Sequence, residues 1–132
     1  MSVNSQSLDG QAGTESAGKH VLIVDDDPNL RQLLTWSLRQ EGYEVSCASN
    51  GIEAIAMVTE SRPDMVILDV VMPRLNGYET CLRLRGFYHA PIIFLSGSGT
   101  ERDIIRGLNY GADDYLAKPF SLGELKAGLG AI

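Results

Sequence analysis

Short apolar runs alternate with longer stretches of helical period along this chain from His20 onward. Two of the runs, Val21–Val24 and Met65–Leu68, are apolar at every position. A strand with this pattern is covered on both faces, as in a parallel sheet between two layers of helices. The pattern predicts five strands, at His20–Val24, Tyr43–Ala48, Asp64–Leu68, Pro91–Leu95 and Asp114–Ala117.

Residues that favour helix starts lie between the predicted strands. Asp27-Pro28 is typical of an N-cap followed by the first helical residue. Three further helix starts resemble capping boxes: Asn50–Glu53, Thr100–Asp103 and Ser121–Glu124. A turn at Asn76-Gly77 leads into the third helix. Pro63 closes the second helix. Alternating strands and helices joined by short loops predict an α/β fold with a parallel sheet and right-handed crossovers.

Composition divides the chain into a short tail and one domain. Residues 1–18 are rich in Ser, Gly, Gln and Asn and contain no aromatic residue, which predicts a disordered tail. Residues 19–132 have the length of a single domain with a buried core.

Charge and apolar content narrow the possible partners. The formal net charge of −6 argues against nucleic acid or an anionic membrane surface as a partner of this domain. The apolar runs are far too short to span a bilayer, and the first residues do not resemble a signal peptide. We therefore expect a cytoplasmic protein in which Cys47 and Cys81 are reduced thiols.

Polar residues follow four of the predicted strands, at the point where each strand ends. Asp25 and Asp26 follow the first strand and Asp69 follows the third. Ser96 follows the fourth strand and Lys118 the fifth. Ligands of open α/β sheets bind at this edge, where the strand order reverses. If the first and third strands are neighbours, three carboxylates meet in one pocket.

Such a cluster of carboxylates requires a cation. Two unit charges about 4 Å apart repel by roughly 4 kcal/mol at an effective dielectric constant near 20. Oxygen ligands without His or Cys select a hard ion, and a partial cage of carboxylates suits Mg²⁺ together with water and a phosphate group. The positive charge of Lys118 can reach an anion bound there.

The same residues carry a resemblance to a known family. The segments VLIVDDDPNLR, VILDVVMPRLNGYE, IIFLSG and GADDYLAKPFS occur in this order, and together they resemble the receiver domain of two-component response regulators. The resemblance extends from His20 to about Ile132. It implies a flavodoxin-like (βα)5 sandwich whose parallel strands have the order 2-1-3-4-5.

The resemblance implies a phosphorylation site with a metal beside it. Asp69 is the phosphoacceptor, whose carboxylate becomes an aspartyl phosphate. Asp26 and Asp69 bind Mg²⁺ directly, together with the backbone carbonyl of Val71, and Asp25 acts mainly through a bound water. Beyond its own phosphorylation and dephosphorylation, a domain of this kind is not an enzyme.

The resemblance also implies contacts to the phosphoryl group and a switch. Lys118 contacts a phosphoryl oxygen, and its peptide bond to Pro119 is cis. The Ser96 hydroxyl and the Gly97 N–H bind the phosphoryl group. Phosphorylation draws Ser96 inward, Tyr115 turns into the vacated space, and the surface around the fourth helix and the fifth strand changes.

Two kinds of partner follow from the resemblance. The phosphoryl donor is a sensor histidine kinase or a histidine phosphotransfer protein, and the changed surface acts on a downstream output domain or protein. In a subgroup of receivers the position of Ile104 is basic, and we expect this isoleucine on the exposed face of its helix. Asp113 and Asp114 are expected to be turn and rim residues.

Two other classes of protein share parts of this pattern. In a phosphohydrolase of haloacid-dehalogenase type, Asp25 would be the nucleophile and Asp27 the acid, but Asn29 stands where these enzymes carry Thr or Val. A flavin-binding electron carrier needs a Ser, Thr or Gly phosphate loop after the first strand. Acidic residues occupy that place here and would repel the phosphate of the flavin.

Overall fold

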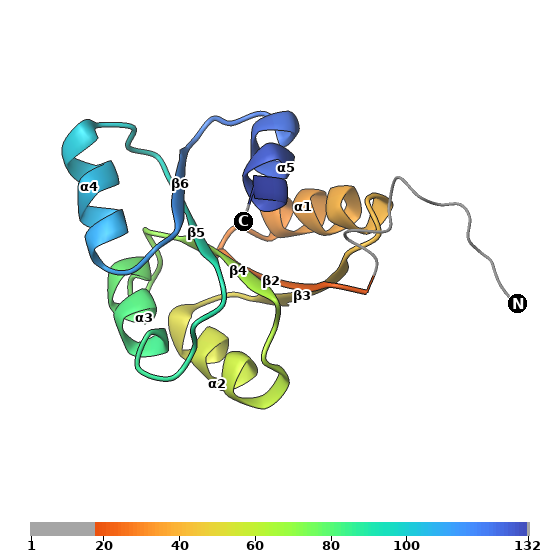
Figure 1. Ribbon diagram of the computed structural model, residues 1–132, viewed down its shortest axis with the longest axis horizontal. Helices are drawn as coiled ribbons and strands as arrows, with labels where there is room; N and C mark the ends of the chain where they lie inside the picture. Colours follow the sequence, from red (N-terminus) through yellow and green to blue (C-terminus); the bar gives the residue numbers. More distant parts are fainter. Residues whose placement is uncertain (1–17, 132) are drawn as a thin grey trace, which may run out of the picture.

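A computed structural model describes residues 18–131, which form a five-stranded sheet between two layers of helices (Figure 1). The tail predicted at residues 1–18 lies outside the described residues except for Gly18. The strands are β2 (His20–Val24), β3 (Glu44–Ala48), β4 (Met65–Asp69), β5 (Ile92–Ser96) and β6 (Asp114–Ala117). All pairs are parallel and the order is β3-β2-β4-β5-β6, which confirms the predicted flavodoxin-like topology.

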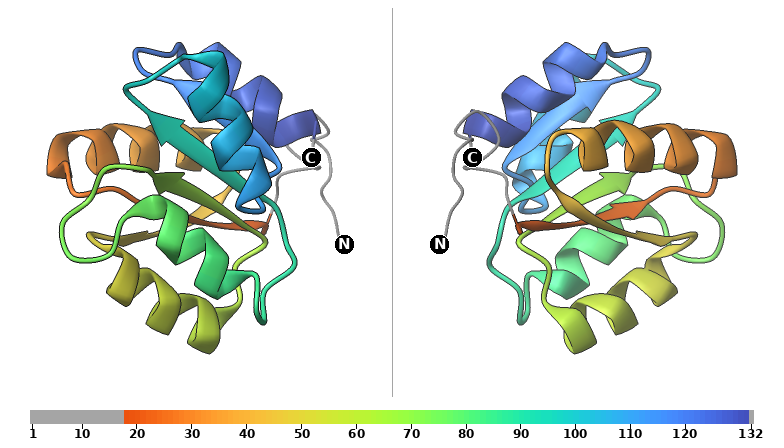
Figure 2. Two further views of the ribbon diagram at one scale, coloured as in Figure 1. Left: turned by 90° about the vertical axis from the view of Figure 1, so that its left-hand side faces the viewer. Right: turned by 90° about the vertical axis from the view of Figure 1, so that its right-hand side faces the viewer.

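Within the described residues, five helices cover the two faces of this sheet (Figure 2). They are α1 (Pro28–Gln40), α2 (Gly51–Ser61), α3 (Gly77–Leu84), α4 (Glu101–Asn109) and α5 (Leu122–Ala131). Helices α1 and α5 pack on one face, and α2, α3 and α4 on the other. Successive side chains of a strand alternate between the two cores, as Val21 and Leu22 do in β2, which explains why the central strands are apolar at consecutive positions.

The predicted helix starts are capped by side chains in the structure, and the predicted Asn-Gly turn before α3 also supplies a cap. The Asp27 carboxylate accepts the Asn29 N–H at 2.9 Å ahead of α1, and the Asn76 side chain accepts the Glu79 N–H at 2.9 Å ahead of α3. Each of these bonds satisfies a backbone donor that has no partner within the helix. The caps fix where the chain leaves the edge of the sheet and turns into a helix.

Three strands differ from the prediction by one residue. Strand β3 starts after Tyr43, and β4 and β5 each begin and end one residue later than expected. The last residues of β4 and β5 are polar, yet both are paired within the sheet: Asp69 with Leu95, and Ser96 with Ala117. The prediction placed the strand ends at the last apolar residue, but a strand ladder is made by the backbone and does not depend on an apolar side chain.

The prediction for Ile104 was wrong. Its side chain is half-buried and packs against the core formed by α2, α3, α4 and the sheet. The neighbouring Ile105, 50% exposed, and Leu108 face outward instead. The two isoleucines are about 100° apart on a helix, so the rotation of α4 about its axis decides which one is buried.

Helix α3 begins in direct contact with the end of β4. The Gly77 N–H donates to the Val70 carbonyl at 2.8 Å. A Cβ atom on Gly77 would lie 2.3 Å from the Asp69 carbonyl oxygen and 2.7 Å from the Val70 Cα. Only glycine allows this approach, because real side chains do not come so close to backbone atoms.

Gly77→Ala is therefore expected to destabilise the protein by about 1–3 kcal/mol, the usual cost of forcing an extra group into a packed site. Gly130→Ala in α5 is the matched control, since a Cβ there meets nothing within 4 Å and alanine favours a helix. Urea unfolding of both variants measures the difference. Equal free energies of unfolding for the two variants would contradict the packing argument.

Candidate functional site

Three carboxylates meet at the carboxyl end of the sheet. Asp25 directly follows β2, Asp26 is next to it, and Asp69 ends β4. Since β2 and β4 are hydrogen-bonded neighbours, one oxygen of each carboxylate lies within 4.8 Å of the others. Asp25 and Asp69 are buried, and Asp26 is exposed. The pocket predicted from the strand ends therefore exists and opens to solvent beside Asp26.

Lys118 brings a positive charge to the two buried carboxylates. Its Nζ donates to Asp25 Oδ2 at 3.2 Å and to Asp69 Oδ1 at 3.3 Å. The lysine follows the edge strand β6, and its side chain extends past β5 to reach them. Its backbone is held by a bond from the Lys118 N–H to the Ser96 carbonyl at 2.6 Å, and the following peptide bond to Pro119 is cis.

The electrostatics of the pocket favour a bound cation. Burial, together with the negative charge of Asp25, raises the pKa of Asp69 to about 6, although Lys118 opposes the shift. Burial alone would lower the pKa of Lys118, but the charges of Asp69 and Asp25 outweigh it and raise that pKa. One ammonium group thus fails to compensate three carboxylates. A set of oxygen donors with excess negative charge fits a hard divalent ion such as Mg²⁺.

Ser96 and Gly97 lie in the loop that leads from β5 to α4. The buried Ser96 hydroxyl accepts the Ser98 N–H at 3.1 Å, which leaves its own hydrogen able to donate to a ligand. Gly97 is exposed. The Ser98 hydroxyl donates to the Asp103 carboxylate in the first turn of α4. This loop is therefore tied to the start of α4 through Ser98.

Tyr115 is buried beneath the same loop. Its hydroxyl donates to the Ser98 carbonyl at 2.8 Å, and its ring lies edge-to-face with Phe94, with 6.3 Å between the centroids. A Cβ on Gly107 of α4 would come within 2.8 Å of the Tyr115 ring, so the glycine makes room for it. The Tyr115 side chain is therefore packed inside the domain, between Phe94 and Gly107.

A contact that the sequence did not predict lies next to the acidic pocket. It is found in a second, shallow pocket lined by Tyr78, Arg106 and Val71, whose side chain is 73% exposed. The Arg106 guanidinium of α4 lies 4.4 Å from the centroid of the Tyr78 ring of α3, a cation–π contact. No pattern in the sequence pairs these two residues, because they belong to different helices.

The arrangement of the pocket defines the class of protein. A five-stranded α/β domain has an acidic pocket at the carboxyl edge of its sheet, with a lysine and a buried hydroxyl directed at that edge. These are the groups that a domain needs in order to accept or transfer a phosphoryl group with the help of a divalent cation. Within residues 18–131, no helix combines the length and the apolar character needed to cross a membrane.

Comparison with known proteins gives the family. The family model of the response regulator receiver domain matches residues 21–129. The receiver domain of a Francisella response regulator has 32% identity and a TM-score of 0.83, over 86% of this chain and 95% of that one. The Vibrio cholerae chemotaxis protein CheY4 has 34% identity and a TM-score of 0.81, over 88% and 99%. The response regulator TrrA of Thermotoga maritima, solved in complex with Mg²⁺-BeF, has 38% identity and a TM-score of 0.77, over 86% and 97%.

The chain belongs to the response regulator receiver domain family. It is a signalling domain of two-component systems, and the acidic pocket of Asp25, Asp26 and Asp69 fits the phosphoacceptor site of that family. The alternative of a haloacid-dehalogenase-type phosphohydrolase finds no support in the family match or in the similar structures.

Replacing Asp69 by Asn should stabilise the metal-free protein in a pH-dependent way. The folded-state pKa of Asp69, about 6, lies above its ordinary value of 3.8, so the ionised group costs folding free energy. This cost is absent below about pH 4, grows as the pH rises, and is complete above about pH 6, where it reaches on the order of 2–3 kcal/mol.

The test is urea unfolding of wild type and Asp69→Asn in EDTA from about pH 4 to about pH 7.5. We expect the advantage of the variant to grow over this range and then level off. A wild type that is the more stable protein at neutral pH in EDTA would show that Lys118 overcompensates the repulsion.

Proposed function

We propose that this domain receives a phosphoryl group on Asp69 from a sensor histidine kinase or a histidine phosphotransfer protein. The observation that carries the proposal is the position of Asp69, which ends β4 beside Asp25 and Asp26 with its Oδ1 3.3 Å from the Lys118 ammonium. The domain spans residues 19–132 behind a tail of residues 1–18, acts in the cytoplasm, and signals to an output domain or protein.

The proposed metal is Mg²⁺, held by the carboxylates of Asp26 and Asp69 and the backbone carbonyl of Val71, with Asp25 binding through a water. Three oxygen donors within 4.8 Å of one another suit this ion, and the similar TrrA was solved with Mg²⁺-BeF. When bound, Mg²⁺ supplies positive charge that stabilises the phosphoryl oxygens during transfer.

The chain's own residues supply the nucleophile and the binding groups. With a pKa of about 6, the Asp69 carboxylate is mostly ionised at neutral pH and can attack phosphorus in line with the departing imidazole nitrogen. An O–P bond forms, the P–N bond breaks, and the electron pair leaves with the imidazole. Lys118 transfers its bond from Asp69 to a phosphoryl oxygen, and the Ser96 hydroxyl and the Gly97 N–H donate to the others.

The proposed switch uses the loop between β5 and α4. A phosphoryl group that attracts the Ser96 hydroxyl moves the residue to which Ser98 is bonded, at 3.1 Å. Ser98 is in turn bonded to Tyr115 and to Asp103 of α4, so the displacement reaches the surface formed by α4, β6 and α5.

Incubation with acetyl phosphate should add a single phosphoryl group, visible by intact-mass analysis, and only in the presence of Mg²⁺. Asp69→Asn should abolish the labelling. Asp27→Asn is the matched control: Asp27 is an exposed N-cap, Asn caps equally well, and labelling should persist. Labelling that survives in Asp69→Asn or in EDTA would refute the assignment.

The phosphorylated protein should be long-lived for a receiver. Val71 presents an apolar, 73% exposed side chain two residues after Asp69, where a polar group would orient an attacking water. Val71→Asn is therefore expected to shorten the half-life of the aspartyl phosphate several-fold, and Val71→Ile, which stays apolar, should leave it unchanged. Decay that slows on Val71→Asn would reverse the argument.

A further inference from the structure

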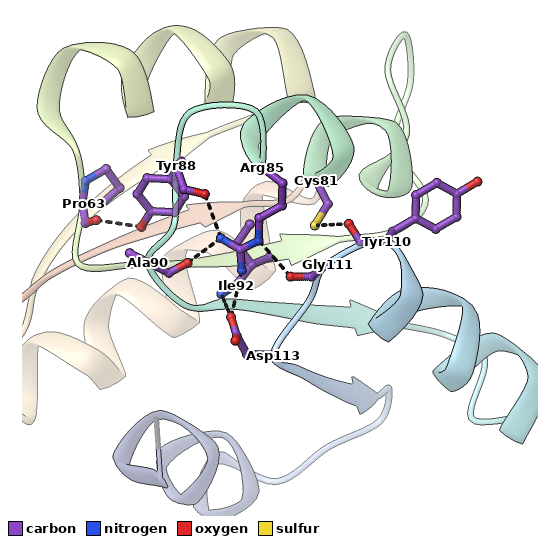
Figure 3. A network of polar contacts seen from close by, with 9 residues as sticks. All are labelled: Pro63, Cys81, Arg85, Tyr88, Ala90, Ile92, Tyr110, Gly111 and Asp113. Carbon is purple, nitrogen blue, oxygen red and sulfur yellow. Dashed lines mark hydrogen bonds and ion pairs between the residues drawn. The ribbon is translucent and has the colours of Figure 1, made fainter.

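The C-terminal end of α3 is bonded to the connection between α4 and β6 (Figure 3). This connection precedes β6, so it lies at the end of the strands opposite the acidic pocket. Arg85, the C-cap residue that follows α3, donates from Nε to the Gly111 carbonyl at 2.9 Å and from Nη2 to Asp113 Oδ2 at 2.8 Å. Cys81, one turn earlier, donates from Sγ to the Tyr110 carbonyl at 3.4 Å. Burial raises the pKa of this thiol to about 11, so it remains a protonated donor.

Arg85 is also anchored to the loop that precedes β5. Its Nη1 donates to the Tyr88 carbonyl at 3.0 Å and to the Ala90 carbonyl at 2.7 Å. The Tyr88 hydroxyl donates to the Pro63 carbonyl at 2.7 Å, just before the central strand β4 (Figure 3). The guanidinium group therefore links the connection before β6 to the loop before β5, and Tyr88 of that loop is bonded to the residue before β4.

Asp113 connects Arg85 to the start of β6 and fixes where this strand begins against β5. Its Oδ2 accepts the Ile92 N–H at 2.9 Å in addition to the Arg85 bond, and its own N–H donates to the Ile92 carbonyl at 2.8 Å. Gly111 fits the same arrangement, because its φ is +109° and a Cβ there would lie 2.8 Å from the Arg85 Cγ.

Strand β6 needs such a fixed start more than any other strand that carries site residues. It is an edge strand of four residues and is paired only with β5. It carries Tyr115, and Lys118 follows its end. A shift by one residue would displace the chain by about 3.3 Å and turn each side chain to the other face. The two bonds of Lys118 to Asp25 and Asp69 could not survive that shift.

We propose that Arg85 is a positioning residue for the phosphorylation site: through Asp113 it sets the place of β6 and thereby the reach of Lys118 and Tyr115. The effect of Arg85 on phosphorylation rests on the proposed function. Its effect on the placement of β6 is independent of that function.

The first experiment measures amide hydrogen exchange of the unphosphorylated protein in wild type, Arg85→Gln and Arg83→Gln. Arg83 is exposed on the same helix and serves as the matched control. We expect Arg85→Gln to speed exchange across residues 111–118, including the Lys118 amide bonded to Ser96, and Arg83→Gln to match wild type. Faster exchange confined to residues 85–92, or spread evenly over the sheet, would overturn the proposal.

The second experiment measures the rate of phosphorylation by acetyl phosphate, well below the melting temperature of every variant. Arg85→Gln and Asp113→Asn should each lower the maximal rate several-fold, and the effect of the double variant should be smaller than the product of the two single effects, because both changes break the shared Arg85–Asp113 contact. A purely structural role would lower the melting temperature and leave this rate at the wild-type value, which would overturn the proposal. If wild type takes up no phosphoryl group, the proposed function fails, and the exchange experiment still decides the placement of β6.

Discussion

One ammonium group between two buried carboxylates is the interaction on which the functional architecture depends. Asp25 and Asp69 lie beside each other because β2 and β4 are neighbours, and Lys118 bonds to both. Burial and the negative charge of Asp25 raise the pKa of Asp69, and the ammonium of Lys118 offsets only part of this shift. The pocket therefore favours both a divalent cation and a modification that recruits the lysine. Arg85 and the edge strand matter because they deliver the lysine to this place.

Much of the fold could be predicted because its signals are local. The runs of β2 and β4 are apolar at consecutive positions, and Asp27 and Asn76 cap the helices that follow. Features set by packing could not be predicted. The ladders of β4 and β5 include Asp69 and Ser96, which a search for apolar residues excludes. The burial of Ile104 instead of Ile105 depends on the rotation of α4 against the sheet.

The carboxylate cluster and the lysine beside it could be predicted because α/β sheets bind ligands where the strands end, and the resemblance then implied a role for each residue. The sequence did not reveal the residues that act through backbone carbonyls or ring faces. Arg85 bonds to three carbonyl oxygens, and any residue type can offer a carbonyl. Arg106 stacks on Tyr78 across two helices. Such contacts leave no pattern of residue types, so only the folded structure exhibits them.

Gly107 has a consequence for the energetics of the signalling surface. The space that it leaves in α4 admits the Tyr115 ring, but a glycine inside a helix costs about 1 kcal/mol relative to alanine. Helix α4 has only nine residues, and a helix of that length is not stable by itself in water. Its folding therefore depends on docking Ile104 and Gly107 against the core that contains Phe94 and Tyr115, which makes α4 prone to local opening. The helix at the proposed signalling surface is thus held in place mainly by its contacts with two aromatic side chains, Phe94 and Tyr115.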